Sequence, residues 1–121
     1  MKLTTRRNGH NLFDALELIR AKPGMYLGWT SAQRDAQLRT LEVLISGYKL
    51  AIDVHGISEC GTNFHEEFTS FVADKTGWSM SRGVVEAILD HLRDEEAWMK
   101  FWSLLDEYKL QVDAHAQAKP H

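Results

Sequence analysis

The residues of this chain that could do chemistry are its histidines, its carboxylates and a single cysteine. The six histidines are His10, His55, His65, His91, His115 and His121. A helical zinc site needs two histidines four residues apart, and no pair here has that spacing. Because Cys60 is the only cysteine, neither an intramolecular disulfide nor a thiolate zinc cluster can form. The sequence therefore predicts no metal site and no cofactor.

Nucleophilic catalysis is not favoured by any local pattern. The groups of a Ser/His/Asp triad meet in space rather than along the chain, so spacing alone does not decide the question. The sequence nevertheless lacks a strand that could hold a nucleophile on a strained strand-to-helix turn. We therefore expect a protein that is not an enzyme.

Carboxylates are unevenly spread along the chain. Residues 1–58 have a formal charge of +3, whereas residues 59–121 have a formal charge of −6. Many of these carboxylates suit helix starts or solvated helix faces. Alternatively, seven of them from neighbouring predicted helices form one acidic surface for a partner: Glu86, Asp90, Asp94, Glu95, Glu96, Asp106 and Glu107. Such a surface would attract a basic partner and speed its association.

The four tryptophans divide by position. Trp98 and Trp102 fit the buried stripe of a helix, which predicts a role in the core. Trp29 and Trp78 lie in connectors, where each either plugs the end of a helix bundle or contacts a partner. Because Trp and Tyr dominate interface hot spots, we take Trp29, Trp78 and Tyr26 as candidate partner-binding residues.

Hydrophobic periodicity predicts an all-α domain of about five helices in an irregular bundle. The expected helices run from Asn11 to Lys22, from about Gln33 to Val54, from Asn63 to Gly77, from Ser79 or Ser81 to about Leu92, and from Asp94 onward. We expect the second, third and fifth to supply most of the core. Residues 1–113 are predicted to form a single domain, followed by a flexible tail over residues 114–121.

Several residues are expected to shape the helices locally. Asn11 and Ser31 are candidate helix caps, and Asn63 with Glu66 has the spacing of a capping box. Gly47 interrupts a long helix and predicts a close crossing with another helix.

Composition narrows the class of protein. A chain of 121 residues with 44% hydrophobic and 26% charged residues is typical of one globular domain. No apolar run reaches the ~20 residues of a membrane span, and the polar start MKLTTRRNGH is not followed by the hydrophobic region of a signal peptide. We therefore expect a cytoplasmic protein without a membrane partner. The acidic balance argues against direct nucleic-acid binding.

The stretch IRAKPGMYLG, Ile19 to Gly28, resembles an element near the start of the ATPase domain of type II topoisomerase subunits such as gyrase B. In that family the next helix carries a catalytic glutamate and a magnesium-binding asparagine, and the matching positions here are Glu42 and Ser46. The family's glycine-rich ATP-lid motifs have no counterpart. We therefore transfer no ATP site. We expect a structural corner in which Pro23 ends a helix and residues 25–27 fold back as a plug.

A second resemblance covers almost the whole chain. The order of ALELIRAKPGMYLG, LEVLISGYKLA, FHEEFTSFVADKTGW, SRGVVEAIL and DEEAWMKFWSLLDEY is similar to a family of small helical bacterial immunity proteins. Such proteins are encoded beside polymorphic or contact-dependent-inhibition toxins. The resemblance implies that the chain binds and neutralises a cognate toxin domain, which could be a nuclease. It implies no catalytic residues.

Two other functions remain open from the sequence. The gyrase-like turn, together with Arg6, Arg7, Arg20 and Lys22, would suit a module that responds to nucleotides or nucleic acids. A helical scaffold or oligomerisation domain is the third possibility.

Overall fold

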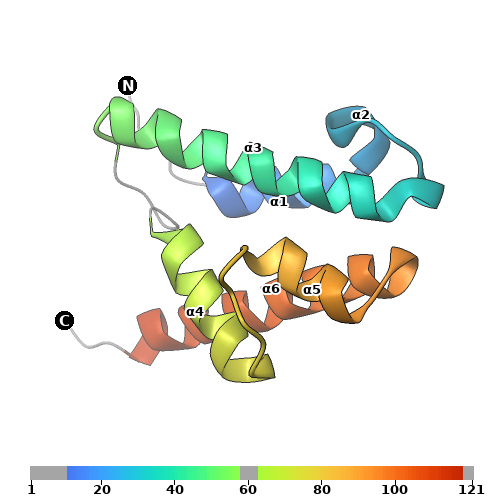
Figure 1. Ribbon diagram of the computed structural model, residues 1–121. Helices are drawn as coiled ribbons and strands as arrows, with labels where there is room; N and C mark the ends of the chain where they lie inside the picture. Colours follow the sequence, from blue (N-terminus) through green and yellow to red (C-terminus); the bar gives the residue numbers. More distant parts are fainter. Residues whose placement is uncertain (1–10, 58–62, 119–121) are drawn as a thin grey trace.

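The computed structural model describes residues 11–57 and 63–118, and within these ranges all regular structure is helical. The elements are α1 (Leu12–Ala21), α2 (Pro23–Leu27), the 3-10 helix η2 (Ser31–Gln33), α3 (Arg34–Val54), α4 (Phe64–Thr76), α5 (Val84–His91) and α6 (Asp94–Ala118). Figure 1 shows two layers, with α1, α2 and α3 in one and α4, α5 and α6 in the other. The predicted all-α, single-domain bundle is confirmed, with one short helix more than expected.

The predicted caps are confirmed in one case and wrong in two. Asn11 and Asp14 form a capping box, in which each side chain accepts a hydrogen bond from the other's backbone N–H at 3.2 and 3.1 Å. Asn63 makes no such bond, so the capping box expected at the start of α4 is absent. The helix after α2 is capped by Thr30 rather than Ser31, through the 3-10 turn η2.

The Pro-Gly stretch is a short helix rather than an open turn. Pro23 occupies the first turn of α2, where its missing N–H costs nothing. The expected plug is reduced to one side chain, because Leu27 is buried while Met25 and Tyr26 are 70% and 44% exposed. Gly28 ends α2 at φ 70° and ψ −166°, a backbone conformation that is almost restricted to glycine.

The boundaries of α5 and α6 differ from the prediction. α5 starts after Gly83, because Ser79 and Ser81 bond to each other in a turn instead of capping it. α6 begins at Asp94, whose φ of 55° lies in the left-handed region, and it continues to Ala118. Residues 114–118 are therefore helical where a tail was expected, and residues 119–121 lie outside the described part, as do Arg6, Arg7 and Cys60.

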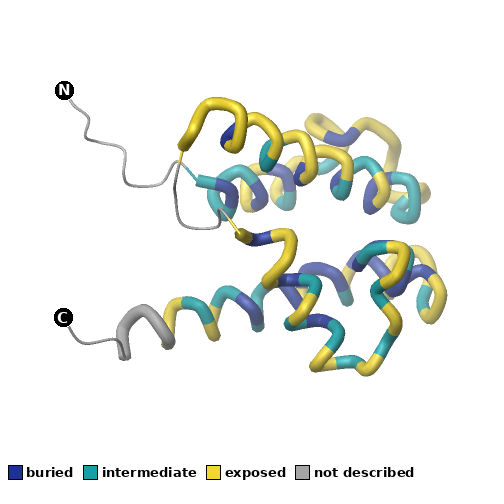
Figure 2. The backbone as a smooth tube through the Cα atoms, turned by 60° about the vertical axis from the view of Figure 1, so that its left-hand side comes forward, coloured by how far each residue is buried: buried dark blue, intermediate teal, exposed yellow. Residues whose placement is uncertain are grey.

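The core lies between the two layers. Figure 2 shows the buried positions on the helix sides that face one another. An aromatic cluster joins α1, α4 and α6: the ring of Tyr108 lies 5.5 to 6.3 Å from those of Phe13, Phe64, Phe68 and Phe71. Trp98 and Trp102 are buried, as predicted. α5 contributes more than expected, through Val84, Val85, Ala87, Ile88 and Leu89.

Replacing Gly28 should destabilise the fold more than replacing Gly24. Gly28→Ala forces a side chain into the left-handed region and should cost about 1–3 kcal/mol in the free energy of unfolding. Gly24 lies in α2, and a Cβ added to it would lie 3.7 Å from the carbonyl oxygen of Trp29, which is an ordinary van der Waals contact. Gly24→Ala is therefore the matched control and should be close to neutral. Urea unfolding of both variants measures the difference, and equal losses would contradict this account of the corner.

Candidate partner-binding surfaces

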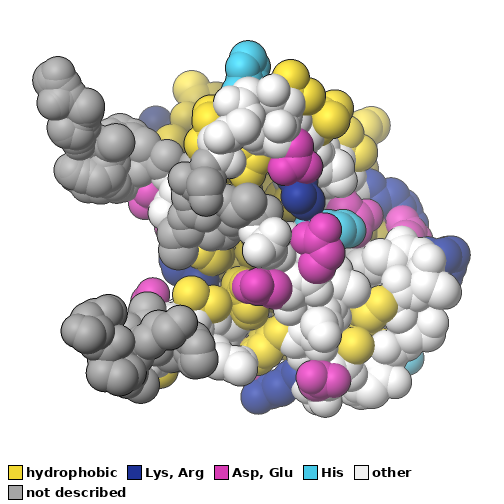
Figure 3. Space-filling view, turned by 90° about the vertical axis from the view of Figure 1, so that its left-hand side faces the viewer, with side chains coloured by type: hydrophobic (Ala, Val, Ile, Leu, Met, Phe, Trp, Pro, Cys, Tyr) yellow, Lys and Arg dark blue, Asp and Glu magenta, His cyan; other side chains and the backbone are white. Residues whose placement is uncertain are grey.

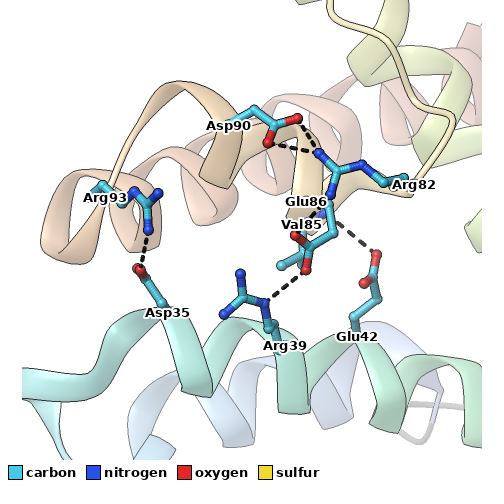
Figure 4. Close-up of polar contacts among 8 residues, drawn as sticks. All are labelled: Asp35, Arg39, Glu42, Arg82, Val85, Glu86, Asp90 and Arg93. Carbon is cyan, nitrogen blue, oxygen red and sulfur yellow. Dashed lines mark hydrogen bonds and ion pairs between the residues drawn. The ribbon is translucent and has the colours of Figure 1, made fainter.

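A layer of ion pairs holds α3 against α5 and the start of α6 (Figure 4). Arg39 on α3 donates to Glu86 on α5 at 2.8 Å, and Arg93 lies 3.5 Å from Asp35 on α3. Beside them Arg82, in the turn before α5, donates to Asp90 on α5 at 2.8 Å. The hydrogen bond from Arg39 lowers the pKa of Glu86. Glu86 and Asp90, predicted to bind a partner, are thus engaged within the chain.

Glu42 reaches across from α3 to the start of α5. Its carboxylate accepts a hydrogen bond from the backbone N–H of Val85 at 3.4 Å, and it lies close to Gly83, which has no side chain to cap the helix (Figure 4). Burial raises the pKa of this carboxyl group. The cavity beside it is about 20 Å³, the size of one water molecule, and has no room for a nucleotide. Glu42 therefore acts as a helix cap supplied from another helix.

The remaining predicted carboxylates lie along α6. Three of them pair with cations on other helices: Glu95 with Arg34 at 2.9 Å, Asp106 with Arg20 through two bonds of 2.8 and 2.9 Å, and Glu107 with Lys75 at 2.9 Å. The side chains of Asp94 and Glu96 form no ion pair with the residues that the structure describes. The prediction of one continuous acidic surface is wrong, because intramolecular cations neutralise most of it and α5 turns its two carboxylates toward Arg39 and Arg82.

One face of α6 forms a shallow depression of about 530 Å³ beside α1, which we call the α6 face. It is lined by Arg20, Glu95, Trp98, Met99, Trp102, Ser103, Asp106, Glu107 and Leu110. Met99 and Leu110 are 62% and 69% exposed, whereas Trp98 and Trp102 are buried. A guanidinium group lies over each indole, Arg34 over Trp98 at 4.2 Å and Arg20 over Trp102 at 5.1 Å. The depression thus brings together Glu95, Asp106 and Glu107, three of the carboxylates predicted to bind a partner. Of the apolar side chains beside them, Trp98 and Trp102 were predicted to lie in the core, and no role was predicted for Met99 or Leu110.

The two connector tryptophans have different surroundings. Trp78 is half-buried and stacks on the ring of His91 at 4.2 Å, which fits the predicted plug rather than a free anchor. Trp29 is about half exposed, and its indole Nε1 donates to the hydroxyl of Thr40 on α3 at 3.2 Å. Only Trp29 remains available to a partner.

A second depression, of about 260 Å³, lies between α1, α2 and α3, and we call it the α1–α3 groove. Its lining consists of Leu12, Ala15, Leu16, Leu18, Ile19, Tyr26, Leu44, Ile45 and Tyr48. Tyr26 stands at its edge, so the Pro-Gly corner borders an apolar groove.

The outer side of α3, which we call the α3 stripe, is apolar and exposed although the sequence analysis did not single it out. It consists of Val43, Leu44, Gly47, Leu50, Ala51 and Val54, with the half-buried Thr40 at one end. The four large aliphatic side chains are 42 to 71% exposed. Figure 3 shows hydrophobic side chains gathered along the upper edge of the molecule, over the end of α3. The signal in the sequence is a second apolar stripe on the helix side opposite Leu38, Leu41, Ile45 and Ile52.

Gly47 lies within this stripe. A Cβ added to it would meet nothing within 4 Å, so the close helix crossing predicted at Gly47 does not occur among the helices that the structure describes.

Comparisons with known protein families, curated proteins and solved structures find no match for this chain. Among residues 11–57 and 63–118, no group of three or more His, Cys, Asp or Glu side chains could hold a metal ion. None of the described helices is both long and apolar enough to span a bilayer.

Removing the charge of Glu42 should stabilise the protein at neutral pH. Because the folded-state pKa is raised, the folded protein binds this proton more tightly than the unfolded chain, and wild-type stability falls as pH rises from the ordinary carboxyl pKa through the raised value. Glu42→Gln keeps the acceptor for Val85 without the charge. Its free energy of unfolding should exceed that of the wild type at pH 7, and the difference should shrink near pH ~4.

The matched control is Glu66→Gln, which removes an exposed carboxylate from the first turn of α4. Its effect should stay within about 0.5 kcal/mol at both pH values. Denaturant titrations at the two pH values measure both variants. A Glu42→Gln protein that is less stable than the wild type at pH 7 would show that the charge, and not only the acceptor, is needed at α5.

Proposed function

We propose that this protein is a non-catalytic immunity protein that binds and neutralises a bacterial toxin domain, and that it does so through the α6 face. The supporting observation is the make-up of that face: large exposed apolar side chains surrounded by three carboxylates and one guanidinium. The chain-wide resemblance to small helical immunity proteins supplies the kind of partner.

The α6 face has the composition of a protein interface rather than of a small-molecule site. Interfaces are enriched in aromatic residues, Met and Arg at the centre and have a polar rim. Here the exposed Met99 and Leu110 line one depression together with the buried indoles of Trp98 and Trp102, and Glu95, Asp106 and Glu107 line it too. Desolvating this centre would supply affinity, because buried apolar anchors carry most of the binding energy in such interfaces.

The α6 face combines ion pairs at its rim with negative charge near the start of α6. Asp106 is held in a bidentate pair with Arg20, and Glu95 is held by Arg34, so both carboxylates are fixed in direction before binding. Asp94 and Glu96 at the start of α6 add negative charge that is not matched by an ion pair among the described residues. A toxin that cuts nucleic acid presents a basic cleft for phosphates, and the carboxylates of Asp94 and Glu96 would be complementary to it.

The polar groups of the described chain support a binding role over a catalytic one. Glu42 caps α5, and the carboxylates of Glu86, Asp90 and Asp106 each accept from an arginine. Most of these groups hold helices together, whereas the exposed side chains include large apolar ones such as Met99 and Leu110. The protein thus offers a partner shape and apolar area.

Met99→Glu should weaken the complex with the toxin encoded beside the gene by about 30-fold or more, which corresponds to the loss of one hot-spot side chain. Met99 is 62% exposed, so the thermal stability of the isolated protein should hardly change. Calorimetry on the co-expressed and separately purified partners measures the affinity. Rescue of toxin-expressing cells should be lost in parallel.

The matched control is Leu18→Glu, an equally exposed side chain in the α1–α3 groove. It should leave the affinity within about threefold, since non-hot-spot positions are close to neutral. If Leu18→Glu weakened the complex more than Met99→Glu, the α6 face would not be the binding surface. Absence of any complex, together with failure to rescue toxin-expressing cells, would exclude the immunity function itself.

The acidic start of α6 should act on the rate of association. A variant that combines Asp94→Asn with Glu96→Gln should associate several-fold more slowly at low salt, and the difference should vanish near 1 M salt, where the screening length is about 3 Å. Asparagine tolerates the left-handed backbone at position 94, so the helix start is retained. Stopped-flow measurements at two salt concentrations give the rates.

A double variant with the same change in charge on α4, Glu66→Gln with Asp74→Asn, is the control. It should leave the association rate nearly unchanged if the position of the charge matters. An equal slowing by both double variants would mean that only net charge steers the partner.

A further inference from the structure

The α3 stripe is symmetric about its central residue. Along a helix with about 100° per residue, its members fall within an arc of roughly 120° that contains no charged side chain. The positions of the stripe are spaced symmetrically about Gly47: Leu44 and Leu50 lie three residues from it, Val43 and Ala51 four, and Thr40 and Val54 seven. A two-fold axis through Gly47 would therefore bring apolar positions onto apolar positions in an antiparallel pair of α3 helices.

Gly47 is suited to the centre of such a pair. It is exposed, and the space above its Cα is open. Helices pack 8–10 Å apart depending on the side chains between them, and a glycine permits the closest approach. Gly47 thus offers a second helix a place to cross α3 closely on its exposed side.

Charges beside the stripe favour the antiparallel arrangement. Arg39 and Asp53 lie on the same edge of α3, toward opposite ends of the stripe. Each is paired within the chain, Arg39 with Glu86 at 2.8 Å and Asp53 with Lys49 at 3.1 Å, so a second copy would add a further charge to each pair. An antiparallel pair brings Arg39 of one copy to the level of Asp53 of the other, whereas a parallel pair would bring like charges together. Self-pairing therefore matches opposite charges at the edge and apolar side chains at the centre.

Side chains next to the stripe would widen the contact. The hydrogen bond to Thr40 holds the exposed indole of Trp29 at one end of the stripe, where Val54 of a second copy would come to lie. Tyr26 and Leu44 at the edge of the α1–α3 groove extend the surface on the other side. This adds aromatic area to an aliphatic strip about 21 Å long, toward the ~800 Å² per partner of a standard interface.

We infer that the α3 stripe binds a second copy of this chain, so that the protein is a homodimer with antiparallel α3 helices crossing at Gly47. The occupant is a copy of this chain rather than a foreign helix, because symmetry about Gly47 and the opposed charges of Arg39 and Asp53 are properties of α3 pairing with itself. The inference is independent of the proposed function, since the α6 face is on a different helix.

Sedimentation velocity of the purified protein at about 50 μM should give twice the monomer mass of 13.9 kDa. Leu50→Glu should raise the dimer dissociation constant by about 100-fold or more, because it places a charge in the apolar centre. Met99→Glu, on α6, should leave the dimer intact. A wild type that is monomeric at this concentration, or a dimer broken by Met99→Glu but not by Leu50→Glu, would overturn the inference.

Cysteine cross-linking tests the geometry in a Cys60→Ser background. Gly47→Cys should form a disulfide-linked dimer on mild oxidation, and so should the double variant Leu44→Cys with Ala51→Cys. Leu44→Cys alone should not, because the antiparallel pair places it beside Ala51 of the other copy. Efficient cross-linking of Leu44→Cys alone would show a parallel pair and contradict the proposed arrangement. Ser103→Cys on the α6 face is the control and should stay monomeric on denaturing gels.

Discussion

The packing of α3 onto α6 is the constraint on which the rest of the structure depends. α3 has 21 residues and buries Leu38 and Leu41 completely, while α6 buries Leu104 and Leu105 to the same extent. Fully burying such a side chain is worth about 1.5–3 kcal/mol, so this contact fixes the rotation of both helices about their axes. Once one side of each helix is committed to the core, the opposite sides must face outward. The α3 stripe and the α6 face are the outward sides of the same contact.

Charged residues at this contact mainly determine how the layers are aligned. Arg20 reaches from α1 to Asp106, Arg34 from α3 to Glu95, and Arg39 from α3 to Glu86. Exposed pairs of this kind contribute little stability individually, but a set of them penalises any shift of one layer along the other. The basic first half and the acidic second half therefore attract each other inside one molecule. The charge asymmetry in the sequence is largely an intramolecular feature.

The sequence predicted the fold class and the main helices because these depend on local pattern. Leu12, Leu16 and Ile19 follow helical spacing, and Asn11 sits where a cap belongs, so α1 was predictable almost to the residue. The start of α5 was not, because its cap is Glu42, 43 residues earlier in the chain. The prediction of one acidic surface was wrong for the same reason. The spacing of the carboxylates along α5 and α6 does not reveal that arginines on α1 and α3 lie opposite them. The α3 stripe was visible as apolar residues, but which of two apolar sides of a helix faces the core is decided by its neighbours.

The cap on α5 also ties the order of folding to the tertiary structure. α5 has eight residues, well short of the roughly 12–15 that an isolated helix needs to persist in water, and Gly83 offers it no side-chain acceptor of its own. Its first turn is completed only when Glu42 on α3 has come into place. α5 therefore forms as it docks rather than before, and a fluctuation that separates the two layers unwinds α5 in the same event. The segment between Gly83 and Leu92 thus behaves as one cooperative unit with α3, although 29 residues separate them in the chain.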